Sequence, residues 1–172
     1  MHPTAHAPRY FTCPAATFDA AERLVIETAR AWFVHKAPSY LFESRLVKAL
    51  GADRADPIQA PFHAVMTSLF LHARRQLRIH PPGCPRISAD ERAVLGLFAA
   101  AAIADGPGLA ARLTWLMPPK GHGVVAVSTE RVTRILVRAG YVFATCPPLR
   151  NTRSTIESAL ENQGITPLRL LG

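Results

Sequence analysis

The chain has 172 residues, of which 49% are hydrophobic, with three cysteines and a formal net charge of +8 at pH 7. This length fits a single domain that buries enough apolar surface to fold without a metal or disulfide framework. The sparse, odd-numbered cysteines exclude a secreted disulfide scaffold, and no apolar run reaches the roughly 20 residues of a membrane helix. Because no signal-peptide pattern opens the sequence, we expect a cytoplasmic protein without a membrane partner.

The N-terminal third predicts an arm followed by helices. Residues 1–16 are rich in Pro, Ala and His and predict an irregular arm, which leaves residues 17–172 as a single helical domain. Apolar residues at helical spacing predict a first helix over 17–36, with its charged side chains, Arg30 among them, largely on the solvent face. A second helix is predicted over 40–50, closed by a glycine.

The next segment predicts a linker, a long helix and a break. Residues 52–56 (ADRAD) predict a polar linker, and the Asp-Pro pair that follows predicts the start of a helix that continues to about residue 78. The sequence HPPGCP over 80–85 then breaks the helix, because its prolines remove backbone donors and fix the backbone.

Residues 88–105 predict the central element of the fold. Ser88 followed by Glu91 has the spacing of a helix capping box. From residue 93 to 104 no side chain is charged or able to form a hydrogen bond, and a helix that is apolar on all sides is buried on all sides. We therefore predict an all-α fold, a single compact bundle of about six or seven helices around this buried helix. The alanines at 99–102 would permit close helix approach within the monomer or across a dimer.

The C-terminal half predicts shorter elements. A Gly-Pro-Gly turn over 106–108 precedes a helix over 109–117, a loop over 118–127 and a helix over 128–139 that begins at a Ser-Thr cap. Beyond it, Ser154 and Glu157 form a second capping box, which opens a helix ending at Gly164. Residues 141–145 and 167–171 are candidates for a short β pair near the C-terminus.

A basic face on the helix over 128–139 is the first candidate site for an anionic partner. Three arginines at i, i+3 and i+7 share this face, and two more follow in sequence: Arg131, Arg134, Arg138, Arg150 and Arg153. They suit phosphate contacts, and the helix could be the second of a helix-turn-helix. Against this, the predicted loop over 118–127 exceeds the three or four residues of that motif. The simpler interpretation is the solvated face of an amphipathic helix.

A second basic cluster surrounds the proline-rich break, with Asp90 and Glu91 as its local acids. It contains Arg74, Arg75, Arg78 and Arg86. These cations either pair internally with the two acids or mark a contact surface.

All three cysteines precede proline. Cys13, Cys84 and Cys146 each resemble the short haem-regulatory Cys-Pro motif, in which a thiolate ligates iron, and they suggest a haem- or redox-responsive sensor. The alternative is that they are small apolar residues at the edges of proline-rich loops. His80 and Cys84 form half of a zinc site without a second half, so we predict neither a metal nor a required cofactor.

The segment CPRISADE over 84–91, followed by an alanine-rich helix, resembles a family of uncharacterised alphaproteobacterial helical proteins. That family has a similar Cys-Pro-Arg-hydrophobic-Ser/Thr-x-x-Glu segment, often with further cysteines before it, where this chain has Pro82 and Gly83. The resemblance covers about residues 60–140 and implies neither an activity nor catalytic residues.

The sequence contains no recognisable catalytic set. It has neither a glycine-rich phosphate loop nor a nucleophile elbow. We therefore expect a non-catalytic helical interaction or regulatory protein, with a protein partner or a second copy of itself. The alternatives are a nucleic-acid-binding regulator that uses the basic face over 131–138, and a sensor that uses the Cys-Pro sites.

Overall fold

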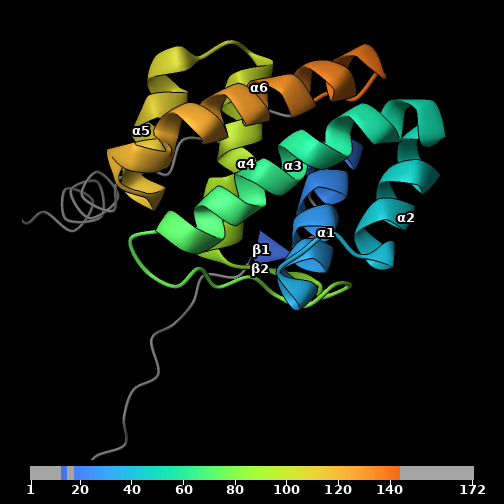
Figure 1. Cartoon of the computed structure of the whole chain (residues 1–172), viewed down its shortest axis with the longest axis horizontal. Coiled ribbons are helices and arrows are strands. Elements are labelled where there is room, and N and C mark those ends of the chain that lie inside the picture. Colours follow the sequence, from blue (N-terminus) through green and yellow to red (C-terminus); the bar gives the residue numbers. More distant parts are fainter. Residues whose placement is uncertain (1–12, 15–17, 144–172) are drawn as a thin grey trace, which may run out of the picture.

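The computed structural model describes residues 13–14 and 18–143, which form six α-helices and one short antiparallel strand pair (Figure 1). The elements are β1 (Cys13–Pro14), α1 (Ala20–His35), α2 (Tyr40–Leu50), α3 (Ala52–His72), β2 (Arg86–Ile87), α4 (Ala89–Ala102), α5 (Gly106–Leu116), the 3₁₀ turn η2 (Pro119–Gly121) and α6 (His122–Arg138). The predicted all-α bundle is confirmed. No helix within the described residues is long and apolar enough to cross a bilayer.

Helix α1 begins at a capping box formed by Asp19 and Glu22. The Asp19 carboxylate accepts from the Glu22 N–H at 2.8 Å, and the Glu22 carboxylate accepts from the Asp19 N–H at 3.2 Å. The apolar face that includes Val25 and Trp32 is buried as predicted. The prediction for Arg30 is wrong, because its side chain is buried and hydrogen-bonded to α4 and to the loop before it.

Helix α3 differs from the prediction at both ends. Only Gly51 (φ +79°) separates α2 from α3, so the predicted linker over 52–56 is instead the first turn of the helix. The helix ends at His72, because tertiary hydrogen bonds replace the next helical ones. The Arg74 N–H donates to the Leu116 carbonyl at 3.0 Å, and the Arg78 N–H donates to the Asp90 carboxylate at 2.7 Å.

Helices α3 and α6 run antiparallel along one side of the bundle, as Figure 1 shows. At one end the Tyr141 hydroxyl, just beyond α6, donates to the Ala49 carbonyl in the last turn of α2, which leads directly into α3. In the core, α2, α3 and α4 meet through Phe42, Phe62 and Phe98. The ring centroids lie 5.7 Å apart in the pair Phe42–Phe62 and again in the pair Phe62–Phe98. Aromatic contacts of this kind stabilise a core beyond the area they bury.

Helix α4 is the buried helix that the sequence predicts, except in its last turn. The Ser88–Glu91 capping box is present, and residues 93–100 are buried. The helix ends at Ala102, and Ile103 (57% exposed) and Ala104 follow at the surface. The prediction that the buried helix continues to residue 105 is therefore wrong. Asp105 then caps α5 by accepting from the Gly108 N–H at 2.9 Å, so the helix begins where a tight turn was predicted.

The only strand pair in the described residues lies elsewhere than predicted. Cys13 pairs with Ile87 and Pro14 with Arg86, so part of the predicted irregular arm crosses the loop before α4. Residues 141–143 do not form a strand. The rest of the predicted C-terminal β pair lies outside the described residues.

Candidate functional site

The predicted basic helix is longer than its sequence suggests. Helix α6 begins at His122, so the predicted loop over 118–127 and the cap at Ser128 are both wrong. The connection from α5 is residues 117–121, of which Pro119–Gly121 form the 3₁₀ turn. This connection is close in length to the turn of a helix-turn-helix. A long loop between α5 and α6 therefore no longer speaks against that motif.

Helix α6 buries one side and exposes a mixed face of valines and arginines. Val125, Thr129, Val132 and Leu136 are buried. The arginines at 131, 134 and 138 are exposed as predicted, and none of them makes an ion pair with another described residue. Exposed valines interleave with them, up to 65% exposed at Val127. We call this set the α6 face: Val124, Val127, Arg131, Arg134, Val137 and Arg138.

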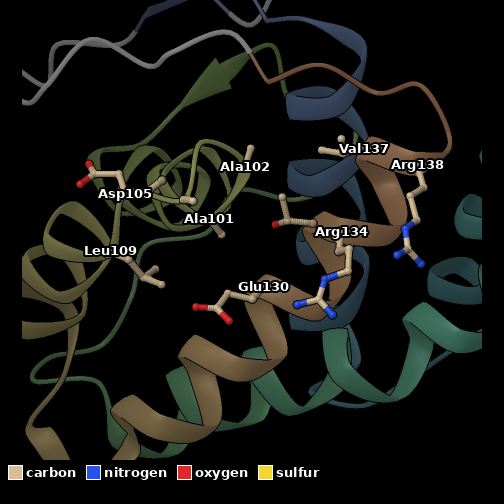
Figure 2. A pocket seen from close by; sticks show the side chains of 12 residues that line it. Ala101, Ala102, Asp105, Leu109, Glu130, Arg134, Val137 and Arg138 are labelled. Atoms are coloured by element: carbon tan, nitrogen blue, oxygen red, sulfur yellow. The ribbon is translucent and has the colours of Figure 1, made fainter.

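A surface groove of about 540 Å³ separates α6 from the end of α4 and the start of α5 (Figure 2). Its floor is apolar and mostly of small side chains: Ala100, Ala101, Ala102, Leu109 and Val137. Figure 2 shows Arg134 and Arg138 extending to the same side of α6, while Glu130 is directed toward Leu109. We call this feature the α4–α6 groove.

The polar groups of the α4–α6 groove differ in whether they are already engaged. Asp105 caps α5, so its carboxylate has a partner. Thr133 lines the groove and is 2% exposed, and its hydroxyl has no hydrogen-bond partner among the residues that the structure describes. A buried hydroxyl without a partner is costly. The groove therefore combines an apolar floor, two cations (Arg134 and Arg138), two carboxylates (Asp105, which is engaged, and Glu130) and one buried hydroxyl without a partner among the described residues.

The second basic cluster is partly paired internally. Both Nη atoms of Arg75 donate to the Asp90 carboxylate, and its guanidinium lies 5.0 Å from the centroid of the Trp115 ring. Arg74 donates from Nε to the Thr114 carbonyl at 2.9 Å. The Arg86 carbonyl accepts from Arg30 at 2.6 Å. These contacts hold the loop between α3 and α4 on the body of the protein.

A buried ion pair that the sequence does not predict joins Arg30 and Glu91. The exposed fractions of their side chains are 1% and 0%, and Nε of Arg30 lies 2.8 Å from Oε1 of Glu91. The remaining guanidinium N–H groups reach the Cys84 and Arg86 carbonyls, the Glu27 carboxylate and the second Glu91 oxygen. Glu91 also accepts from the N–H groups of His80 and Ser88. The sequence carries no local signal for this pair, because the spacing of charged residues places Arg30 on the predicted solvent face and its partner lies 61 positions away.

Opposing effects set the pKa of each carboxyl at the start of α4. For Glu91, burial raises the pKa, but hydrogen bonds from Arg30 and from the N–H groups of Ser88 and His80 outweigh burial, so the pKa lies below its usual value. For Asp90, burial again opposes the shift, and the Arg75 guanidinium together with the Arg78 N–H lowers the pKa. Both groups are therefore held as carboxylates.

The Cys-Pro candidates are only partly within the described residues. Cys84 is half-buried with a free thiol, and its carbonyl accepts from Arg30 at 2.7 Å. Cys146, Arg150 and Arg153 lie outside the described residues. Within residues 13–14 and 18–143 no group of three or more His, Cys, Asp or Glu side chains could hold a metal ion. The haem- or redox-sensor alternative stays a prediction.

Comparison of the chain with protein-family models, curated proteins and solved structures finds no match. The family resemblance of the segment over 84–91 therefore stays a prediction as well.

We expect Arg30→Met to lower the free energy of unfolding by about 3–5 kcal/mol, because it leaves the Glu91 carboxylate buried without its cation. Arg23→Met, on the exposed side of the same helix, is the matched control and should change it by less than about 0.5 kcal/mol. Denaturant unfolding of both variants measures the difference. Equal effects from the two substitutions would contradict this account of the ion pair.

Stability should also fall on acidification. Because the folded-state pKa values of Asp90 and Glu91 are lowered, the stability they contribute is complete above their unfolded values of about 4 and is lost as pH falls through the folded values. Unfolding free energies measured from neutral pH to below pH 4 should decrease, with a smaller decrease in Glu91→Gln than in the wild type. Parallel curves for the two proteins would refute this assignment.

Proposed function

We propose that this chain is a non-catalytic interaction protein that binds an acidic segment of another protein through the α6 face. The observation that carries the proposal is the set of three exposed arginines without ion-pair partners in the described part of the chain, interleaved with exposed valines on one helix. Protein interfaces combine apolar contact with arginine in this way. Arginine also pairs with carboxylates in a bidentate manner, which favours an acidic partner.

The engagement of the buried acids supports a non-catalytic role. Asp90 and Glu91 are fixed as carboxylates by arginines and by backbone N–H groups of the same fold. Burial raises the pKa of Glu22, but its carboxylate is part of the α1 capping box, away from the α4–α6 groove. The residues that line the groove include neither histidine nor cysteine. Its two carboxylates, on Asp105 and Glu130, therefore have neither of these partners beside them, and Asp105 is already engaged as the cap of α5.

A nucleic-acid-binding regulator is the second candidate. The short connection over 117–121 favours it, because it places α5 and α6 at nearly the spacing of a helix-turn-helix. The valines of the α6 face are less suited to it, since phosphate contacts dominate the affinity of nucleic-acid binders. We therefore rank the acidic protein partner first.

The α6 face should account for partner capture. We expect the triple variant Arg131→Glu, Arg134→Glu, Arg138→Glu to lose co-purifying proteins that the wild type retains, because carboxylates would oppose the acidic partner. The matched control reverses three exposed cations on other helices, Arg23, Lys48 and Arg54, and should retain them. Quantitative mass spectrometry compares the three samples, and light scattering reports whether the partner is a second copy. Equal capture by both triple variants would show that the partner does not bind through the α6 face.

Binding to duplex DNA separates the two candidates. If the protein partner is correct, wild-type protein should show no α6-dependent binding to a fluorescent DNA duplex at physiological salt. Binding that weakens steeply with salt and falls in the α6 triple variant, but not in the control triple variant, would instead favour the nucleic-acid-binding regulator.

A further inference from the structure

The α4–α6 groove has the properties of a surface that receives a helix. Small side chains at Ala100, Ala101 and Ala102 allow a second backbone to approach closely, and Leu109 and Val137 extend the apolar floor. Arg134 and Arg138 are spaced i, i+4, so they offer two cations about 6 Å apart along one side. A suitable occupant is a short helix with one apolar face flanked by two carboxylates at the same spacing.

The chain carries such a segment downstream of α6, outside the described residues. The sequence over 154–164 predicts a capped helix, in which Ile156, Ala159 and Leu160 share one face. Glu157 and Glu161 flank that face at i, i+4, which matches the spacing of the two arginines.

We propose that residues 154–164 dock as a helix in the α4–α6 groove, antiparallel to α6, with Glu161 against Arg134 and Glu157 against Arg138. The ten residues between 143 and 154 span up to roughly 33 Å, whereas the return along α6 to Arg134 is about 14 Å. Pro147 and Pro148 break the helical path within this connection and allow the reversal.

The docked segment would regulate partner binding. It covers Arg134 and Arg138, which the acidic partner also needs, so the partner must displace it. This regulatory consequence rests on the proposed function, whereas the docking itself does not.

Hydrogen exchange of the full chain, with no partner present, tests the docking. We expect the amides of residues 158–163, which donate within the predicted helix, to exchange at least about tenfold more slowly than unprotected peptide. Arg134→Glu should abolish most of that protection, and so should Glu161→Arg. The charge-exchanged double variant Arg134→Glu, Glu161→Arg should restore it to within about threefold of the wild type. Glu161 is chosen because substitution of Glu157 would also remove the helix cap.

The matched control combines Arg131→Glu with Glu161→Arg. Arg131 belongs to the α6 face but does not line the groove, so this pair should not restore protection. Unprotected amides in the wild type, or protection that survives both single substitutions, would overturn the proposal. Protection that grows with protein concentration would assign the groove to the segment of a second copy and would also overturn it. Docking without any gain in partner capture by Glu161→Arg would leave the docking in place and reject the regulation of partner binding, whereas the α6 triple variant tests the proposed function itself.

Discussion

The contact between Arg30 and Glu91 is the constraint on which the rest of the fold depends. Burying both ions costs several kcal/mol each, and their attraction offsets this cost only when the remaining donors and acceptors are also satisfied. Here they are, because the guanidinium reaches Glu91, Glu27 and two loop carbonyls, and Glu91 accepts two backbone N–H groups as well. The pair thus joins α1, α4 and the loop that precedes α4. Without it, four backbone groups of that loop would lose these partners: the Cys84 and Arg86 carbonyls and the His80 and Ser88 N–H groups.

Fixing the start of α4 also positions its other end. Asp90 and Glu91 anchor the first turn from two sides, and the apolar residues that follow extend as one rigid helix to Ala102. The last turn then emerges beside α6, where alanine side chains leave room that larger residues would fill. The position of the groove therefore follows from where α4 begins. The first turn of α4 is held by ion pairs and its middle is buried, so only its C-terminal end reaches the surface.

The elements that the sequence predicts well are those with local signals. The Ser88–Glu91 capping box, the helix over 40–50 and the arginine spacing of α6 depend on nearby residues, and the structure contains each of them. The errors arise where tertiary contacts override local preference. Helix α3 stops at His72 because α4 and α5 accept its next donors. Helix α6 begins at His122, before Ser128, although Gly123 and three valines lower the local helix preference there, because Val125 is buried in the core. The burial of Arg30 depends on a partner 61 positions away, which no periodicity reveals.

The valines and arginines of the α6 face favour recognition of a protein over a purely structural role for α6. A helix that only covers a core gains nothing from exposed valines, and each one leaves apolar surface in water. Solvated arginines alone need no explanation, because exposed charges are ordinary at a surface. The combination of valines and arginines does need an explanation. The valines gain free energy when a partner buries them, and the unpaired arginines select a partner of negative charge and fix its orientation. The same logic applies to the groove. Its alanine floor allows close approach, and its two arginines, which lie in a lining that also contains Glu130 and the engaged Asp105, can pair with carboxylates of an occupant. The α6 face and the groove therefore favour the same class of acidic, amphipathic occupant.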